Sequence, residues 1–404
     1  MMMENKNLSG AFPRNLAVMG STGSIGCQTL DVVARYPHKF KIKALTAHCN
    51  WKLLAEQALE FVPDLVVIAD EQYYSPLKAA LSGSTIKVLA GKEALIEAAT
   101  LPDVDYVVGA LVGYSGLPST VAALEAGKHV ALANKETLVV AGELIEKIVN
   151  RKGKRILPVD SEHSAIFQSL FGEKREALSR IILTASGGPF RTFTPAQLQN
   201  VTVGQALKHP NWDMGAKVTI DSATMMNKGF EMIEARWLLN IAPENIDVVV
   251  HPESVVHSLV EFIDGSVKAQ LGLPDMRLPI EVALSYPYRL DLLATTGASS
   301  LNLAEIGQLS FERPDTDKFP LLSLAYHAAE KGGLVPAVMN AANEVAVKAF
   351  LEEKIGFTDI SRMVIDIVEK LGPRFSGTEV SPESIAAAHD EGTKIAQSLI
   401  NNKL

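Results

Sequence analysis

A glycine-rich turn between an apolar run and an amphipathic segment constrains the fold of this chain more than any other feature. The apolar run at residues 16–19 leads directly into residues 20–26, GSTGSIG, and an amphipathic segment follows from Thr29. The spacing is G-x-x-G-x-x-G, shifted by one residue from the usual G-x-G-x-x-G. Glycines at a strand-to-helix turn let the backbone approach a pyrophosphate, whose charge meets free N–H groups and the positive end of the helix dipole. The turn predicts dinucleotide binding, although steric demands alone can also require glycine there.

Short apolar runs alternate with longer amphipathic segments over the first 160 residues. The runs lie at residues 16–19, 42–45, 65–68, 86–89, 106–108, 130–132 and 156–159. Strands that alternate with helices pair in parallel through right-handed crossovers. We therefore expect the α/β fold class, with a Rossmann-like, doubly wound parallel sheet at residues 1–160 that binds the dinucleotide.

The pattern changes after residue 160. Apolar runs at 246–250, 255–262 and 267–271 include one pair joined by Asp264-Gly265, which is a strong hairpin signal. We expect a mixed α/β catalytic domain at residues 161–294, with a mobile lid loop at about 206–216, and a linker at 295–320. Helical periodicity at 321–331, 336–354, 359–371 and 382–400 predicts a C-terminal helical bundle at 321–404.

Composition excludes several classes of protein. The 404 residues include 38 Lys and Arg against 46 Asp and Glu, a formal net charge of −8. Without a basic face, sequence-independent binding to nucleic acid or to an anionic membrane is not expected. Cys27 and Cys49 are too few for a disulfide framework, and the N-terminal residues lack the apolar core of a signal peptide. We therefore expect a cytoplasmic protein.

Two carboxylates follow the apolar run at 156–159. Asp160 and Glu162 are two residues apart on what we expect to be extended chain, so that they point the same way beyond the carboxyl end of a strand. Their oxygens suit a hard divalent cation such as Mg²⁺ or Mn²⁺. The alternative is a helix start, with Asp160 or Ser161 as the N-cap and Glu162 favouring the helix dipole. This segment alone leaves both interpretations open.

A second polar set lies at residues 219–231. Asn227 and Glu231 are four residues apart, so a helix would place them on one face with Lys228 beside them. Ser222, Asn227 and Lys228 offer hydrogen-bond donors that can bind a phosphate. Glu231 can complete a metal site of three carboxylates with Asp160 and Glu162. Alternatively, Lys228 and Glu231 form an ordinary surface ion pair.

Three further stretches suit a binding site or an ordinary loop. Residues 184–190, TASGGPF, offer backbone donors to an anion. Residues 208–215 place His209 and Trp212 in a segment broken by Pro and Gly, as in a lid. Residues 134–136 follow another strand, which places them at the same carboxyl-terminal edge of the sheet as the glycine turn. The absence of an acidic residue at 44–50 favours NADP over NAD, while His251 and His257 are expected to be structural.

These motifs together resemble the 1-deoxy-D-xylulose 5-phosphate reductoisomerase family of the non-mevalonate isoprenoid pathway. GSTGSIG, LANKE, PVDSEH, SGGPF, HPNW, DSATMMNKG and NAANE occur in the family's order over nearly the whole chain. The resemblance implies conversion of 1-deoxy-D-xylulose 5-phosphate to 2-C-methyl-D-erythritol 4-phosphate, by metal-assisted skeletal isomerisation followed by reduction with NADPH. It also implies a homodimer whose only other partner is a small phosphorylated sugar.

The resemblance further implies the residues of the site. NADPH would be held by Thr22, Gly23, Ser24, Ile25, Asn50, Asn134, Glu136 and Gly215. Mg²⁺ or Mn²⁺ would be held by Asp160, Glu162 and Glu231. The substrate would meet Lys135, Ser161, Glu162, Ser186, His209, Trp212, Ser222, Asn227, Lys228 and Glu231. The candidates for proton transfer are the catalytic residues Lys135, Glu162 and Lys228, and metal-bound water. One departure is His48-Cys49, where many members carry Gly-Lys before the asparagine equivalent to Asn50, so the contact with the 2′-phosphate stays unassigned, with His48 and Lys52 as candidates from the residue pattern.

Two other functions stay open on the sequence. A simple NADP-dependent dehydrogenase of a phosphorylated or amino acid would use the carboxylates only to orient its substrate. A dinucleotide-sensing module with a helical dimerisation bundle would bind NADPH without turnover.

Overall fold

The computed structural model describes residues 12–212, 214–297 and 299–402, and the chain divides into two compact units. Unit 1 comprises Met1–Asn134, Ile145–Ser164 and Asp275–Ser300. Unit 2 comprises Lys135–Leu144, Ala165–Pro274 and Leu301–Leu404. Contacts thus divide the chain in two, and the finer division expected at residues 160, 294 and 320 stays a prediction.

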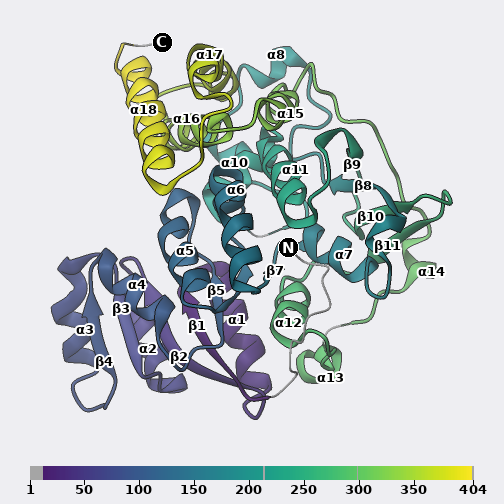
Figure 1. The fold of residues 1–404 in the computed structure, drawn as a ribbon. Coiled ribbons are helices and arrows are strands. Elements are labelled where there is room, and N and C mark those ends of the chain that lie inside the picture. The colour runs from purple at the N-terminus through teal and green to yellow at the C-terminus, as the bar shows by residue number, and fades with distance from the viewer. Residues whose placement is uncertain (1–11, 213, 298, 403–404) are drawn as a thin grey trace. The chain divides into compact units, whose positions relative to one another are not determined.

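Unit 1 is built on a seven-stranded sheet in the order β4-β3-β2-β1-β5-β6-β7. All neighbouring strands of this sheet pair in parallel. The strands are β1 (Arg14–Met19), β2 (Phe40–Ala47), β3 (Leu65–Ile68), β4 (Lys87–Ala90), β5 (Tyr106–Gly109), β6 (His129–Leu132) and β7 (Ile156–Pro158). This doubly wound α/β sheet confirms the expected fold class (Figure 1).

Helices connect the strands of unit 1 or return to them from later in the chain. They are α1 (Ser24–Arg35), α2 (Trp51–Phe61), α3 (Tyr74–Ala80), α4 (Lys92–Thr100), α5 (Leu117–Glu125), α12 (Arg277–Ser285) and α13 (Leu292–Thr296). Two more helices, α6 (Lys135–Lys152) and α7 (Ser161–Ser169), run across the boundary between the units. Short 3₁₀ turns lie at Glu71–Tyr73 and Gly113–Gly116.

Buried residues account for the stability of the central strands of unit 1 and for the position of α12, which follows the return of the chain to unit 1 at residue 275. Leu16, Ala17 and Val18 of β1 are fully buried, as expected for a parallel strand that is covered on both faces. The buried guanidinium of Arg14 donates hydrogen bonds to the carbonyl oxygens of Leu284, at 2.5 Å, and Tyr286, at 2.7 Å. A desolvated charge is stabilised only when such partners are present, so Arg14 holds the end of α12 in unit 1.

Unit 2 contains a four-stranded mixed sheet in the order β11-β10-β8-β9. Its strands are β8 (Leu178–Ala185), β9 (Ile246–Val250), β10 (Val256–Phe262) and β11 (Val267–Leu271). β8 and β9 pair in parallel, whereas β10 is antiparallel to both of its neighbours. Gly265 has a φ of 81° between β10 and β11, so the predicted Asp-Gly hairpin is confirmed.

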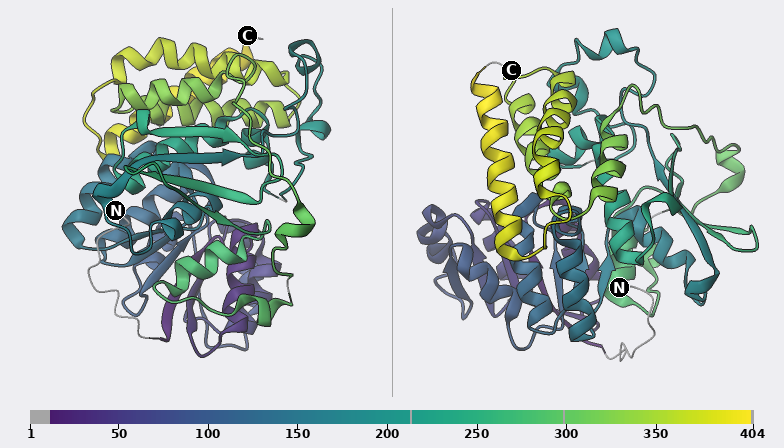
Figure 2. Two further views of the ribbon diagram at one scale, coloured as in Figure 1. Left: turned by 90° about the vertical axis from the view of Figure 1, so that its right-hand side faces the viewer. Right: turned by 45° about the horizontal axis from the view of Figure 1, so that its top comes forward.

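The longer helices of unit 2 lie to one side of this sheet (Figure 2). The longer ones are α10 (Ala216–Ala223), α11 (Met226–Leu239), α15 (Leu321–Lys331), α16 (Val335–Leu351), α17 (Phe357–Phe375) and α18 (Pro382–Asn401). The short elements are α8 (Pro195–Leu198), α9 (Val203–Ala206), α14 (Leu303–Ile306) and 3₁₀ turns at Arg175–Ala177 and Pro243–Asn245. The four predicted C-terminal helices are confirmed, with ends that shift by at most four residues.

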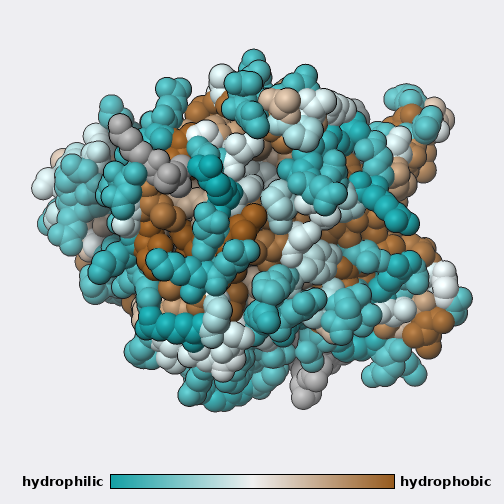
Figure 3. All heavy atoms as spheres, turned by 90° about the horizontal axis from the view of Figure 1, so that it is seen from above, coloured by the Kyte–Doolittle hydropathy of each residue, from teal (hydrophilic) through white to brown (hydrophobic). Residues whose placement is uncertain are grey.

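Helical periodicity orients the C-terminal helices. Ile360, Val364, Ile367 and Leu371 of α17 recur every three or four residues and are all buried. Hydrophilic residues predominate on the face seen in Figure 3, which looks onto the side where α17 and α18 lie in Figure 1. None of the helices among the described residues is long and apolar enough to cross a membrane.

Candidate active site

The glycine turn of unit 1 is sterically fixed at both of its ends. Gly20 has a φ of 88°, and a Cβ there would lie 2.8 Å from the carbonyl oxygen of Ala110. A Cβ on Gly26 would lie 2.2 Å from the carbonyl oxygen of Gly20. Between them, Gly23 is the N-cap of α1, and a Cβ there would meet only the carbonyl oxygen of Gly20, at 3.4 Å. The outer side of the turn is therefore open at the positive end of α1.

Asn50 and Asn134 are two expected cofactor residues, and their side chains form hydrogen bonds with backbone groups of unit 1. Asn50 caps α2, since its Oδ1 accepts a hydrogen bond from the N–H of Leu53 at 3.4 Å. Asn134 is 3% exposed and donates to the carbonyl oxygens of Leu111, at 2.5 Å, and Gly113, at 2.9 Å. Both side chains therefore shape the loops that follow β2 and β6.

The carboxylates after β7 lie at a helix start rather than on extended chain. Helix α7 begins at Ser161, and the N–H of Ser164 donates to the carbonyl oxygen of Asp160 at 2.9 Å. Ser161 Oγ donates to Glu162 Oε2 at 2.5 Å. The expected extended geometry is wrong, because Asp and Ser favour N-cap positions and Glu is stabilised in a first helical turn. This helix start does not exclude a metal-binding role for either carboxylate.

Asn227, Lys228 and Glu231 share one face of α11, as their spacing predicted. Asn227 Nδ2 donates to Glu231 Oε1 at 2.5 Å, and Lys228 Nζ pairs with Glu231 Oε2. Lys135, at the start of α6, donates to Asn227 Oδ1 at 2.7 Å and to Glu231 Oε1 at 2.9 Å. Lys228 is 3% exposed and Glu231 1%, so the alternative of a surface ion pair is wrong.

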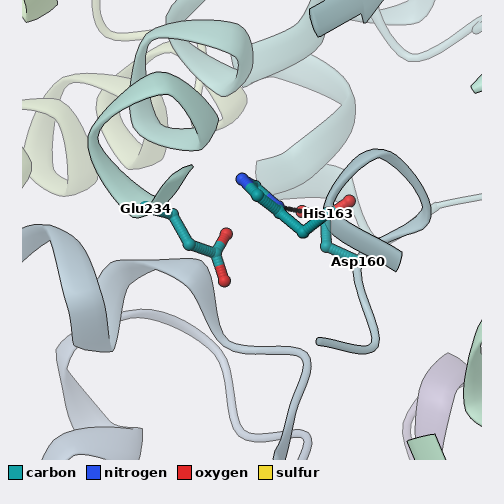
Figure 4. A group of neighbouring side chains, drawn as sticks. All are labelled: Asp160, His163 and Glu234. Carbon is teal, nitrogen blue, oxygen red and sulfur yellow. Dashed lines mark ion pairs between the residues drawn. The ribbon is translucent and has the colours of Figure 1, made fainter. Parts of the chain in front are cut away.

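His163 and Glu234 also carry groups that suit a cation, although no motif of the sequence singles them out. Figure 4 draws both with Asp160, and its dashed line marks the 3.9 Å ion pair between His163 Nδ1 and Asp160 Oδ2. His163 and Asp160 follow β7, whereas Glu234 lies on α11 and is 1% exposed. No spacing motif could have selected them, because His163 and Glu234 come from segments that are far apart in the sequence.

Glu136 belongs to a second buried ion-pair cluster in unit 2, which the sequence did not reveal. Lys217 Nζ lies 2.5 Å from Glu136 Oε1 and 2.9 Å from Asp221 Oδ2, and Asn343 Nδ2 donates to Asp221 Oδ1 at 2.7 Å. Burial opposes the charge of Lys217, but Asp221 and Glu136 outweigh it and raise the pKa of Lys217 above its ordinary value. Burial raises the pKa of Asp221, whereas Lys217 outweighs burial at Glu136 and lowers the pKa of that carboxyl.

The two clusters of unit 2 are joined because Lys135 and Glu136 are consecutive residues. Lys135, Lys217 and Lys228 carry three positive charges, and Glu136, Asp221 and Glu231 carry three negative ones. The buried set is therefore neutral when every member is ionised, which is the condition under which buried charges are tolerated. Ser222 directly follows Asp221 on α10, so this network holds the expected phosphate-binding segment in place.

Ser186 and His209 meet at the end of β8. His209 Nδ1 accepts hydrogen bonds from the N–H groups of Asn211, at 3.2 Å, and Trp212, at 3.0 Å. Burial lowers the pKa of His209 to about 4, so the ring is neutral near pH 7 and its proton lies on Nε2. Nε2 is 3.0 Å from Ser186 Oγ and donates to it. The hydroxyl proton of Ser186 is left to donate to another acceptor, such as a phosphate oxygen.

Trp212 lies in the loop between α9 and α10 that was expected to form the lid. Its ring centroid is 6.0 Å from that of His257, which is 7% exposed. The neighbouring Asp213 lies outside the described residues. His251 has the structural role expected of it, since it is fully buried, its Nδ1 is 2.8 Å from the carbonyl oxygen of Ser310, and its Nε2 accepts from two N–H groups of β10 and the loop before it.

The free energy of unfolding is expected to fall as the pH drops from about 6.5 toward 4. Burial lowers the pKa of His129 and of His257 to about 4, whereas an unfolded histidine titrates near 6.5. Between these values the unfolded chain binds protons that the folded chain does not. Each of these imidazoles therefore lowers the free energy of unfolding at pH 5 by about 1–2 kcal/mol, relative to its value above about pH 6.5.

Urea unfolding at pH 7 and pH 5 measures this loss. His129→Gln and His257→Gln should each lose less stability than the wild type between the two pH values. His38→Gln is the matched control, because His38 is exposed. An identical pH dependence in all four proteins would contradict the assignment.

Three family models match the chain. The model described as 1-deoxy-D-xylulose 5-phosphate reductoisomerase matches residues 16–142, its C-terminal domain matches 156–239, and the DXP reductoisomerase C-terminal domain matches 271–395. Among relatives of that name, the protein of Chloroherpeton thalassium is 54% identical over 88% of this chain and 91% of its own length. The protein of Phocaeicola vulgatus is 52% identical over 96% of this chain and 100% of its own.

Solved structures are similar over the same length. The 1-deoxy-D-xylulose 5-phosphate reductoisomerase from Zymomonas mobilis in complex with NADPH is 47% identical, with a TM-score of 0.88 over 96% of this chain and 99% of that one. A DOX-P reductoisomerase in complex with NADPH, fosmidomycin and magnesium is 42% identical, with a TM-score of 0.91 over 96% of this chain and 98% of that one.

Proposed function

The chain belongs to the 1-deoxy-D-xylulose 5-phosphate reductoisomerase family, and we propose that the residues selected from its sequence carry out that family's reaction. It converts 1-deoxy-D-xylulose 5-phosphate to 2-C-methyl-D-erythritol 4-phosphate in isoprenoid biosynthesis, with NADPH and Mg²⁺. The observation that carries this conclusion is similarity over 96% of the chain to a relative 52% identical. When bound, NADPH supplies a hydride and the divalent cation supplies a Lewis acid.

Asp160, Glu162 and Glu231 are the proposed ligands of the divalent ion. Three carboxylates offer the oxygen donors that Mg²⁺ and Mn²⁺ prefer. Glu231 fits this role, because it is 1% exposed and is oriented by its ion pairs with Lys135 and Lys228. Each carboxylate oxygen has two lone pairs, so these ion pairs leave capacity for a cation.

The turn residues Thr22, Gly23, Ser24 and Ile25 are proposed to hold the phosphates of NADPH. The fit is supported by the open outer side of this turn at the N-terminus of α1. Asn50, Asn134, Glu136 and Gly215 would complete the cofactor site. Since the side chains of Asn50, Asn134 and Glu136 already have partners within the chain, we propose that these residues act chiefly through their backbone.

Ser186, Ser222, Asn227 and Lys228 are the proposed phosphate ligands of the substrate. The neutral His209 supports this role, because its Nε2–H donates to Ser186 and turns the serine hydroxyl into a donor for the ligand. Lys228 contributes an ammonium group, which compensates the charge of a phosphate. Ser161 and Glu162 would meet the sugar end of the substrate.

Lys135, Lys228 and Glu162 are the groups proposed to move protons. Lys135 Nζ and Lys228 Nζ already donate to Glu231 and so hold protons at fixed atoms. Glu162 Oε2 accepts from Ser161 and can accept a proton from the substrate. Positioned acids and bases of this kind contribute about 10²–10⁴-fold to a rate.

NADPH oxidation with 1-deoxy-D-xylulose 5-phosphate tests the proposed function. The absorbance of NADPH should fall only with a divalent ion present, stop on addition of EDTA, and resume with excess Mg²⁺ or Mn²⁺. Turnover that EDTA leaves undiminished would contradict the metal assignment and favour a simple dehydrogenase. Cofactor binding without turnover would favour a sensing module.

Trp212→Ala is expected to raise the KM for the substrate about tenfold, with the KM for NADPH nearly unchanged. The indole would cover bound substrate and exclude water when the loop closes, and losing a buried aromatic contact costs about 1–2 kcal/mol. Steady-state kinetics with each substrate varied in turn measure the effect. Trp212→Phe is the matched control and should keep most of the affinity, whereas equal, negligible effects of both variants would remove the lid assignment.

We propose a homodimer from the family resemblance and a cytoplasmic location from the sequence. Sedimentation velocity of the purified chain would overturn the first if the protein were monomeric. Cell fractionation would overturn the second if the chain were found with the membranes.

A further inference from the structure

Ser21, in the glycine turn of unit 1, points its side chain into the protein rather than toward the open side of the turn. It is fully buried, whereas Gly23 and Ser24 are exposed. The hydroxyl therefore belongs to the support of the turn, and neither the sequence motif nor the proposed cofactor contacts gives it a role.

Gln57, on α2, forms two reciprocal hydrogen bonds with the buried Ser21. Ser21 Oγ donates to Gln57 Oε1 at 2.7 Å, and Gln57 Nε2 donates to the carbonyl oxygen of Ser21 at 3.0 Å. Gln57 is 6% exposed. An amide is suited to this position because it offers a donor and an acceptor at once.

The end of β2 fixes the remaining polar groups at the start of the turn. The N–H of Ser21 donates to the carbonyl oxygen of Thr46 at 2.8 Å, and the N–H of Gly20 donates to Thr46 Oγ1 at 2.9 Å. The N–H of Ser21 is thus held by Thr46 and its carbonyl oxygen by Gln57, while its hydroxyl lies 2.7 Å from Gln57 Oε1 and 3.2 Å from the carbonyl oxygen of Thr46. Residues 22–25 follow directly, so the direction of their N–H groups depends on this anchor.

Cys27 completes the surroundings of Gln57. Its Sγ is 3.5 Å from the carbonyl oxygen of Ser21 and 3.7 Å from Gln57 Nε2. Burial raises the pKa of the Cys27 thiol, which keeps it uncharged near pH 7. No charge in this set competes with the phosphates that the turn is proposed to bind, so Gln57 acts on the turn through geometry alone.

We propose that Gln57 is a positioning residue for NADPH, which it affects through Ser21 and the turn. This inference rests on the proposed function, in which residues 22–25 hold the phosphates of the cofactor. Without the Gln57 amide, the buried carbonyl oxygen of Ser21 keeps only the weak thiol donor of Cys27, and the Ser21 hydroxyl keeps only the longer 3.2 Å contact with the carbonyl oxygen of Thr46. A buried polar group that loses its best partner is costly. The turn then shifts to regain hydrogen bonds, and its N–H groups no longer converge on the pyrophosphate.

Fluorescence titration with NADPH tests this role in Gln57→Met, which keeps the length of the side chain and removes both polar groups. The Kd for NADPH should rise about tenfold, a change that corresponds to about 1.4 kcal/mol. The KM for 1-deoxy-D-xylulose 5-phosphate and kcat, both measured at saturating NADPH, should stay within about twofold. A Kd within twofold of the wild type, or an equal rise in the substrate KM, would overturn the inference.

A double-mutant cycle with Ser21→Ala separates positioning from general destabilisation. If Gln57 acts through Ser21, the double variant should bind NADPH no more weakly than Gln57→Met alone. Additive losses would mean that the two residues act independently and would overturn the inference. Should Gln57→Met not fold, Ser21→Ala carries the test with the same expected selectivity for the Kd of NADPH.

Ser24→Asp distinguishes failure of this inference from failure of the proposed cofactor site. It places a carboxylate in the first turn of α1, where it would repel a bound pyrophosphate. If Ser24→Asp leaves the Kd for NADPH unchanged, the turn does not hold the cofactor and the proposed function fails at this point. If Ser24→Asp weakens binding and Gln57→Met does not, only the positioning role of Gln57 is wrong.

Discussion

Glu231→Gln is expected to lower kcat by at least about a thousandfold, while the Kd for NADPH changes by less than about twofold. Glutamine keeps the shape of the side chain and an oxygen for Asn227 and Lys135, but it removes the charge that a divalent cation needs. A thousandfold loss corresponds to about 4 kcal/mol of transition-state stabilisation. Steady-state kinetics at saturating Mg²⁺, with fluorescence titration of NADPH, measure both quantities.

The stability of this variant decides how the kinetic result is interpreted. Lys135 and Lys228 both pair with Glu231, so urea unfolding must show that Glu231→Gln is folded under the conditions of the assay. If the folded variant loses affinity for NADPH and keeps its kcat with bound cofactor, Glu231 is structural and the metal assignment is wrong.

Lys217→Met is expected to lower the free energy of unfolding by about 3–5 kcal/mol, which is the usual cost of removing one partner from a buried ion pair. The substitution leaves the carboxylates of Glu136 and Asp221, both buried, without their shared cation. Urea unfolding at pH 7 measures the change. Lys348→Met is the control, because the side chain of Lys348 is 77% exposed and its loss should cost less than about 0.5 kcal/mol.

The double variant Lys217→Met with Asp221→Asn tests whether charge balance is the cause. It returns the buried set to neutrality, and the amide oxygen that replaces the carboxylate of Asp221 would still accept the hydrogen bond from Asn343. Part of the lost stability should therefore return. A Lys217→Met variant within about 1 kcal/mol of the wild type, or a double variant no more stable than the single one, would contradict a charge network at this position.

Local patterns predicted the elements of the fold well, because their causes lie within short windows of sequence. The Asp264-Gly265 hairpin follows from turn chemistry, and the C-terminal helices follow from apolar residues at helical spacing. Asn227 and Glu231 meet because residues four apart share a helix face. Motif order over nearly the whole chain carried the prediction of function.

Contacts between distant residues were beyond these patterns. Lys217 and Glu136 are 81 residues apart, and Gln57 and Ser21 are 36 apart, so no period or spacing connects them. The apolar run 156–159 favours extended chain as far as Glu162, whereas capping by the polar residues after this run begins α7 at Ser161. Asp160 and Ser161 are residues that favour N-cap positions, and they indicate this helix start.

Calorimetric titration with Mn²⁺ is the most direct test of the central claim, that Asp160, Glu162 and Glu231 hold the catalytic cation. Asp160→Asn, Glu162→Gln and Glu231→Gln should each weaken Mn²⁺ binding by at least about tenfold. Glu234→Gln is the matched control, because Glu234 lies on the same helix as Glu231 and is equally buried at 1% exposure, and it should bind Mn²⁺ as the wild type does. Undiminished binding by Glu231→Gln together with a loss in Glu234→Gln would contradict the account and assign the cation to Glu234.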